Sequence, residues 1–347
     1  MPTHPAIAEN LSQLLAFPAA ILPRISRASC YPAADVTSAG PVDLSVNIGA
    51  LRLRNPIIAA SGTFGYGLEF AHLIDLNAIG SFVTKGLSLN PIQGSPAPRL
   101  CHTPSGMLNA VGLQNVGVRA FVTEKLPVLR KYVTPVLVNI FGYSPEEYAE
   151  VIRILEDAPG VAGYELNISC PNVKQGGIQF GSDPAMVSQV VGVARQSAAS
   201  RPLWVKLSPL VTDIRVIAKA AEEAGADGLT VANTYPAMSI DVKAGRSRLG
   251  CPTGGLSGPA IRPITVRLVW EAAKAVRIPI IGLGGVETVD DVLEYLSVGA
   301  TAVQVGTANF VAPRAVGEIA EELGRHVVGH NIKNIKELTE VLVPKLD

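Results

Sequence analysis

The chain has 347 residues, 48% of them hydrophobic, and its 29 basic side chains balance its 29 acidic ones. That length suits one large domain with additions or two smaller domains. With no net charge and no basic stripe, nucleic-acid binding is not indicated, so any attraction for an anionic ligand has to be local. The cysteines stand far apart without a C-x-x-C pair, which argues against a zinc or iron–sulfur site and against a disulfide scaffold in this chain.

Residues 1–40 are expected to form an N-terminal extension that is poorly ordered. Its apolar stretch, Leu11 to Leu22, is interrupted by Pro18 and is too short to span a bilayer. No basic segment precedes it, so a secretory signal is not indicated. The alternative to a disordered tail is a short helix that docks on a membrane surface or on a partner.

After residue 40 the pattern becomes regular. A hairpin is expected at residues 44–48 and 51–53, followed by eight short apolar strands separated by segments with helical spacing. Continuous apolar strands that alternate with helices indicate a parallel sheet covered on both faces. Eight such units predict a (β/α)8 TIM barrel over residues 41–347, with a doubly wound open sheet as the alternative. The strands are expected at residues 57–60, 82–85, 136–140, 164–168, 203–207, 228–233, 279–282 and 302–305.

Two strand-to-strand intervals, of about 50 residues each, are longer than a βα unit needs. They contain residues 106–115 and 253–258. Both additions follow a strand and precede the next helix, so they are predicted to extend the loops at the C-terminal face, where barrels carry their active sites.

Polar residues terminate several of the apolar strands. They are Lys85, Asn139, Asn167, Lys206 and Asn233. One strand-end asparagine is often only a turn former, but five polar residues on five strands predict a shared ligand site at the mouth of the barrel. A buried ammonium is costly unless an anion meets it. The two lysines therefore either snorkel to solvent or present two positive charges to an anionic substrate or to a cofactor that becomes anionic.

Glycines follow the last two predicted strands, at Gly284-Gly285 and at Gly306-Thr307. In barrels these two loops commonly hold a phosphate through backbone N–H groups. Either run alone could be a tight turn. Together, at these two positions, they predict a phosphate site.

Cys170 follows the end of a strand, in the run Glu165 to Asn172. No histidine lies nearby in the sequence, so a Cys–His nucleophile pair is not indicated, and a general base fits the thiol better. Cys30, Cys101 and Cys251 are interpreted as inert. The five histidines show no metal-ligand spacing, so no metal is predicted.

Over about residues 42–325 these segments together resemble the dihydroorotate dehydrogenases. The segments are Asn55-Pro56-Ile57-Ile58, residues 61–65, Thr84-Lys85-Gly86, residues 109–115, residues 167–172, Val205-Lys206-Leu207, Ala232-Asn233-Thr234, Ser257-Gly258-Pro259, Gly284-Gly285 and Gly306-Thr307.

The resemblance implies FMN at the top of the barrel and oxidation of (S)-dihydroorotate to orotate in de novo pyrimidine (UMP) biosynthesis. It makes Cys170 the base that removes the C5 proton, with hydride passing from C6 to flavin N5, and adds Lys85 and Lys206 as catalytic residues. Lys206 would face the pyrimidine edge of the flavin. Substrate binding is implied for Lys85, Asn109, Ala110, Val111, Gly112, Leu113, Asn167, Asn172, Asn233 and Thr234. FMN binding is implied for Ser61, Lys85, Gly86, Asn139, Asn167, Lys206, Ala232, Gly258, Gly284, Gly285, Gly306 and Thr307.

The cysteine base resembles class 1 of the family, and the segments 61–65 and 253–259 resemble class 1B. Class 1B implies a homodimeric core joined to a second subunit, which carries FAD and a [2Fe–2S] cluster and passes electrons to NAD⁺. The implied assembly is a heterotetramer in the cytoplasm without a transmembrane segment. The N-terminal extension departs from class 1, and class 2 enzymes use such a segment to reach quinone.

Three alternatives stay open. A module like dihydropyrimidine dehydrogenase would bind FMN but act on uracil or thymine. A flavin-free aldolase would form a Schiff base at Lys206. A non-enzymatic barrel would only bind a phosphate ligand.

Overall fold

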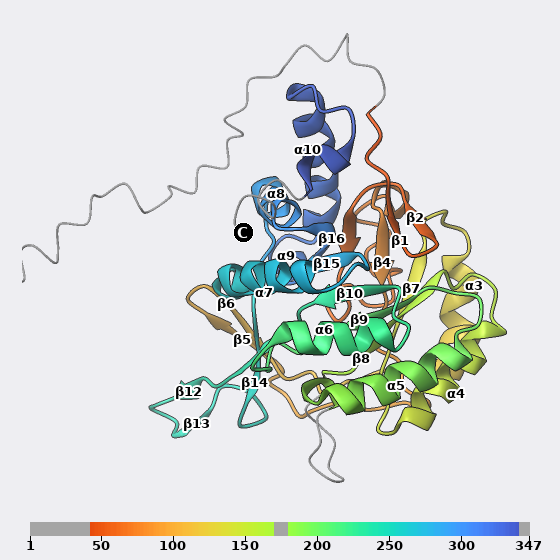
Figure 1. The fold of residues 1–347 in the computed structure, drawn as a ribbon. Helices are drawn as coiled ribbons and strands as arrows, with labels where there is room; N and C mark the ends of the chain where they lie inside the picture. The colour runs from red at the N-terminus through yellow and green to blue at the C-terminus, as the bar shows by residue number, and fades with distance from the viewer. Residues whose placement is uncertain (1–41, 170–179, 340–347) are drawn as a thin grey trace, which may run out of the picture. The chain divides into compact units, whose positions relative to one another are not determined.

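The computed structural model describes residues 42–169 and 180–339 (Figure 1). The chain divides into two units, Met1–Ser38 and Ala39–Asp347, and the first lies entirely outside the described residues. The predicted N-terminal extension therefore stays a prediction. Within the described ranges, none of the helices combines the length and the apolar character that crossing a membrane requires.

Eight parallel strands close into a barrel, which confirms the predicted fold (Figure 1). Nearly every residue of these strands is buried, since helices cover the outside and side chains fill the inside. In barrel order from the first they are β3 (Ile57–Ala59), β4 (Ser81–Val83), β7 (Val136–Ile140), β8 (Gly163–Asn167), β9 (Leu203–Lys206), β10 (Gly228–Val231), β15 (Ile280–Leu283) and β16 (Ala300–Val305).

Four of the surrounding helices begin at residues suited to capping. Ser144, Asp183, Asp213 and Thr288 each accept a hydrogen bond from a backbone N–H of the first turn, which satisfies a donor that the helix cannot use itself. The longer helices are α4 (Pro145–Glu156), α5 (Pro184–Ser197), α6 (Ile214–Glu223), α7 (Arg262–Ala275), α8 (Val289–Ser297) and α10 (Ala315–Gly329). Shorter helical segments are α2 (Val118–Ala120), α3 (Leu126–Leu129) and α9 (Ala308–Val311).

The predicted hairpin is present as β1 (Val46–Ile48) and β2 (Leu51–Leu53), paired antiparallel. Ile48 is fully buried, and a Cβ on Gly228 would lie only 2.8 Å from its Cγ2 atom. Since Gly228 begins β10, the hairpin packs at the N-terminal end of the barrel. The opposite end is left for the site.

The two predicted insertions meet in a second, antiparallel sheet of order β11-β14-β6-β5, whose pairing was not predicted. Strand β6 from the first insertion pairs with β14 from the second, with Asn109 opposite Gly255 and Met107 opposite Ser257. The contact is close, because a Cβ on Gly106 would lie 2.2 Å from the Ser257 carbonyl oxygen. The strands are β5 (Leu100–Thr103), β6 (Gly106–Asn109), β11 (Tyr235–Ala237) and β14 (Gly254–Ser257), and a two-stranded ribbon, β12 (Ile240–Asp241) with β13 (Arg246–Ser247), extends beyond them (Figure 1).

Candidate active site

A cavity of about 1210 Å³ lies where the C-terminal ends of the barrel strands meet the antiparallel sheet. It exceeds the roughly 300–1,000 Å³ of a pocket for one small ligand, so it has room for a cofactor together with a substrate. Each of the eight barrel strands contributes a lining residue at or close to its C-terminal end. They are Ser61, Lys85, Asn139, Asn167, Lys206, Ala232, Gly284 and Gly306.

Every predicted site residue within the described ranges lines this one cavity. Besides the eight strand-end residues, these are Gly86, Asn109, Ala110, Val111, Gly112, Leu113, Asn233, Thr234, Gly258, Gly285 and Thr307. Cys170 and Asn172 lie outside the described residues. Ser169, which precedes Cys170 in the chain, lines the cavity.

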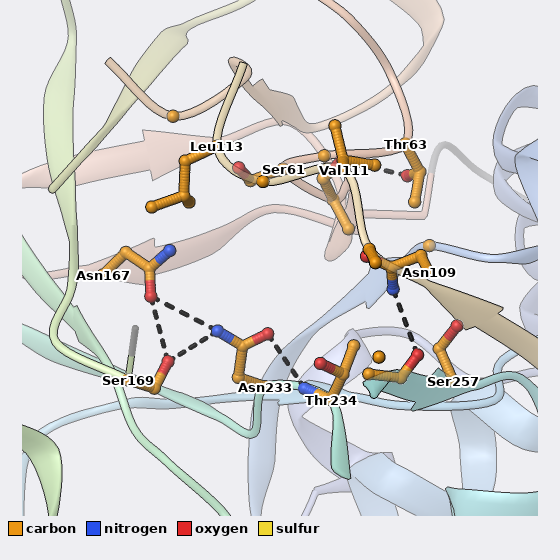
Figure 2. A pocket seen from close by; sticks show the side chains of 18 of the residues that line it. Ser61, Thr63, Asn109, Val111, Leu113, Asn167, Ser169, Asn233, Thr234 and Ser257 are labelled. Atoms are coloured by element: carbon orange, nitrogen blue, oxygen red, sulfur yellow. Dashed lines mark hydrogen bonds between the residues drawn. The ribbon is translucent and has the colours of Figure 1, made fainter. Parts of the chain in front are cut away.

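Two carboxamides on one side of the cavity are joined by a serine hydroxyl (Figure 2). Asn233 Nδ2 donates to Ser169 Oγ at 2.5 Å, and Ser169 Oγ donates to Asn167 Oδ1 at 2.9 Å. The oxygen of Asn233 accepts from the Thr234 backbone N–H at 2.9 Å. These bonds set which way each amide faces, so that the Asn167 NH₂ group is left to donate to a ligand. Ser169 was not predicted as a site residue, although it lies in the singled-out run.

Lys85 is half-buried on the cavity wall, two residues after β4. Burial lowers its pKa from the usual value, the positive charge of Arg99 lowers it further, and Glu69 acts in the opposite direction. Arg99 itself is held by the carbonyl oxygens of Gln93 and Ser95. Lys85 and Arg99 therefore provide the local positive charge that a chain of zero net charge needs to attract an anion.

Lys206, the last residue of β9, is 5% exposed, and its Nζ lies 4.0 Å from Oε1 of Glu165. Burial lowers its pKa, while the Glu165 carboxylate opposes the shift. Glu165 was not predicted as a site residue. A charged residue inside the apolar strand β8 was the signal for it, because an unpaired carboxylate would not be buried there.

The glycine loops after β15 and β16 converge with Gly258 on the cavity. Gly285 has φ +68°, and a Cβ there would lie 2.7 Å from the Gly258 carbonyl oxygen, so the two loops pack too closely at this point for any side chain. The first turn of α8 is capped by Thr288 and carries Asp290 and Asp291. The loop backbone is thus better placed than α8 to receive an anion.

The residues of the site suit both ends of FMN, the phosphate and the flavin ring. The glycine loops provide backbone donors for a phosphate, and Lys206 provides a buried positive charge at the strand ends. On the wall of the same cavity, Oδ1 of Asn139 is buried without a hydrogen-bond partner in the described part of the protein. A buried acceptor of this kind indicates a donor that a ligand supplies.

Comparison with known proteins agrees with this geometry. The family described as dihydroorotate dehydrogenase matches residues 43–327. A Pelobacter propionicus protein and a Geobacter sulfurreducens protein, both named dihydroorotate dehydrogenase B (NAD(+)), catalytic subunit, are each 54% identical over 300 residues, which is 86% of this chain and 98% of the relative. A Solibacter usitatus protein, provisionally named dihydroorotate dehydrogenase A (fumarate), is 54% identical over 299 residues, again 86% of this chain and 98% of the relative. This chain belongs to the dihydroorotate dehydrogenase family.

Proposed function

We propose that this protein oxidises (S)-dihydroorotate to orotate with bound FMN, in de novo pyrimidine (UMP) biosynthesis. The observation that carries the proposal is that the two lysines, the hydrogen-bonded amides and the glycine loops all line one cavity. These are the positions that the family resemblance assigns to cofactor and substrate. The names of the relatives support the same reaction.

FMN would be held by residues of the strand ends and the glycine loops. Bound there, it would supply the acceptor for the hydride from substrate C6. Lys206 would stabilise the negative charge that reduction brings to the cofactor, since a buried charge acts strongly in a medium that excludes water. The residues are Ser61, Lys85, Gly86, Asn139, Asn167, Lys206, Ala232, Gly258, Gly284, Gly285, Gly306 and Thr307.

The substrate is a small anionic ring with amide groups, and the residues assigned to it suit that chemistry. Lys85 would bind the carboxylate, and the oriented amides of Asn167 and Asn233 would bind the ring. Asn109, whose Nδ2 donates to the Gly255 carbonyl oxygen at 3.2 Å, is held by the antiparallel sheet. Ala110, Val111, Gly112, Leu113, Asn172 and Thr234 complete the proposed substrate site.

Cys170 is the proposed base for the C5 proton. It follows Ser169, a residue of the cavity wall, in the chain. A free thiol has a pKa of about 8.5, so only a minority of it is thiolate at neutral pH. The reaction should therefore respond to pH in a way that identifies the base.

For the electron acceptor we propose NAD⁺, reached through a partner subunit with FAD and a [2Fe–2S] cluster. The assembly would be a cytoplasmic heterotetramer with a homodimeric core. Two of the relatives above are named as catalytic subunits of NAD(+) enzymes, which supports the proposal, whereas the third carries a fumarate name at the same identity.

Substrate choice is tested by mixing the FMN-loaded protein anaerobically with dihydroorotate, dihydrouracil or dihydrothymine and following flavin absorbance. We expect rapid bleaching with dihydroorotate only. Bleaching by the uncharged dihydropyrimidines and not by dihydroorotate would assign the protein to the alternative activity.

The acceptor is tested by steady-state turnover of the purified chain with NAD⁺ or fumarate, alone and after co-expression with a candidate iron–sulfur partner. The proposal expects NAD⁺ reduction only when the partner is present. Turnover with fumarate by the chain alone would contradict the NAD⁺ assignment and leave the substrate assignment in place.

A further inference from the structure

Glu165 is a buried carboxylate at the centre of a hydrogen-bond network inside the barrel. Its side chain is fully buried on β8. Oε1 accepts from Asn139 Nδ2 at 2.8 Å, while Oε2 accepts from Thr230 Oγ1 at 2.8 Å and from Gln304 Nε2 at 2.7 Å. These three partners stand on β7, β10 and β16, so one side chain joins four strands across the barrel interior.

The hydrogen-bond partners of Glu165 are donors. Both of its oxygens accept hydrogen bonds from amide or hydroxyl donors, which suits a carboxylate that can only accept. The ammonium of Lys206 supplies the opposite charge, with Nζ 4.0 Å from Oε1. The Lys206 side chain is 6% exposed, so solvent does little to screen the pair.

Glu165 does not reach the cavity, but two of its neighbours do. Asn139 and Lys206 line the cavity, whereas the Glu165 side chain has no exposed surface. The bond from Asn139 Nδ2 to Glu165 turns the amide so that Oδ1 is left without a partner among the described residues. The carboxylate thus decides which end of the Asn139 amide a ligand meets.

We propose that Glu165 is a positioning residue of the flavin site, which keeps Lys206 protonated beside the cofactor and orients the Asn139 amide toward it. The inference rests on the proposed function, because it requires FMN in this cavity. Glu165 itself touches neither cofactor nor substrate. It acts through two residues that line the cavity.

The test is the flavin midpoint potential of the FMN-loaded Glu165→Gln variant, measured as a difference from the unmodified protein over a series of pH values. At low pH Lys206 keeps its proton in the variant, and loss of the carboxylate leaves an uncompensated positive charge that raises the potential. At higher pH Lys206, buried without a counter-charge, loses its proton and the potential falls below that of the unmodified protein. The difference therefore changes sign as pH rises.

Between the lowest and the highest pH, we expect the difference in midpoint potential between the two proteins to change by at least about 30 mV. For a two-electron couple this is a tenfold change in the relative affinity for reduced over oxidised flavin. Glu165 is the charged group that acts on Lys206 in the part of the chain that the structure describes. Cys170 titrates in both proteins, so its contribution cancels in the difference. A difference independent of pH would overturn the inference.

Thr230→Val is the matched control, because it removes one hydrogen bond to Glu165 and leaves the charge. Its potential should differ from the unmodified protein by a constant amount at all pH values. A sign change in this variant as well would assign the effect to general loosening of the network and overturn the inference.

A second comparison covers the case in which Glu165→Gln does not fold. The double variant Glu165→Gln/Lys206→Met removes both buried charges, which proteins commonly tolerate. Measured against the unmodified protein, it should show a difference of constant sign, because neither buried charge of the pair remains, and a sign change there would contradict the proposal. If the unmodified protein binds no FMN, the proposed function fails, whereas bound FMN with a pH-independent Glu165→Gln difference refutes only the role of Glu165.

Discussion

Two regions that enclose the cavity are built in different ways. The floor is formed by Asn139 and Lys206, with Glu165 and Thr230 buried beneath them; these residues stand on neighbouring barrel strands and are at most 5% exposed. The roof, formed by β5, β6, β11 and β14, comes from two insertions that pair across the mouth of the barrel. The floor is fixed by strand register, and the roof by contacts between residues about 150 positions apart, such as Asn109 with Gly255.

This difference between floor and roof suggests a separate task for each region. The charge that we propose acts on the cofactor, on Lys206, is buried at the end of a barrel strand where water is largely excluded, which strengthens its effect. Some of the proposed substrate contacts, such as Asn109, lie on the roof, where a loop can differ without disturbing the barrel. Changes in the floor should therefore affect the redox step, and changes in the roof should affect substrate binding.

The largest effect is expected from Cys170, which lies outside the described residues. Loss of a general base costs about 10²–10⁴-fold in rate, so Cys170→Ala should slow flavin reduction by dihydroorotate by that factor. In the unmodified protein the rate of flavin reduction should rise with pH until the thiol has titrated. In the variant the slow rate should stay the same over this pH range. A flat profile between about pH 6 and 10 in the unmodified protein would exclude Cys170 as the base.

In the floor, Lys206→Met should slow flavin reduction by about 10²–10³-fold, the range seen when one preorganised electrostatic group is removed. Dihydroorotate binding should weaken far less. Stopped-flow reduction at several substrate concentrations separates the limiting rate from the half-saturating concentration. Equal losses in both would indicate a general structural role for Lys206.

Lys85 lines the cavity two residues after β4 and should act on substrate affinity. Burial and Arg99 lower its pKa, so its positive charge is lost at a lower pH than for an exposed lysine. Dihydroorotate should consequently bind more weakly as the pH rises toward 10. In Lys85→Met the affinity should be about 10- to 100-fold lower and independent of pH in this range, as expected for one charged contact. Unchanged affinity in that variant would remove Lys85 from the substrate site.

The smallest effect is expected from a change confined to the roof. In Gly255→Ala the new Cβ would lie 2.1 Å from Thr234 Oγ1, and such overpacking costs about 1–3 kcal/mol. We expect the KM for dihydroorotate to rise about tenfold, with FMN affinity unchanged by fluorescence titration. Gly192→Ala is the control, because a Cβ there meets nothing within 4 Å in α5 and should leave both values unchanged. Equal weakening of FMN and substrate would mean that roof and floor are not separate.

The barrel could be predicted because its strands are continuous apolar runs, and the site because Lys85, Asn139, Asn167, Lys206 and Asn233 interrupt that pattern at strand ends. The antiparallel sheet could not, since the pairing of β6 with β14 depends on residues far apart in the chain and on glycines that read as loops. Glu165 had a local signal, a charge inside an apolar strand, but its role could not be predicted for a similar reason. Its hydrogen-bond partners stand on three other strands, and strand closure, not local sequence, brings them together.

The central claim is that one cavity holds flavin and substrate side by side. It is tested most directly by titrating the oxidised, FMN-loaded protein with orotate while recording the visible flavin spectrum and, in parallel, the heat of binding. We predict that the flavin spectrum changes saturably with orotate, and that the spectral and the calorimetric titrations give the same dissociation constant. Orotate that binds by calorimetry while the flavin spectrum stays unchanged would place the product away from the cofactor and contradict the account.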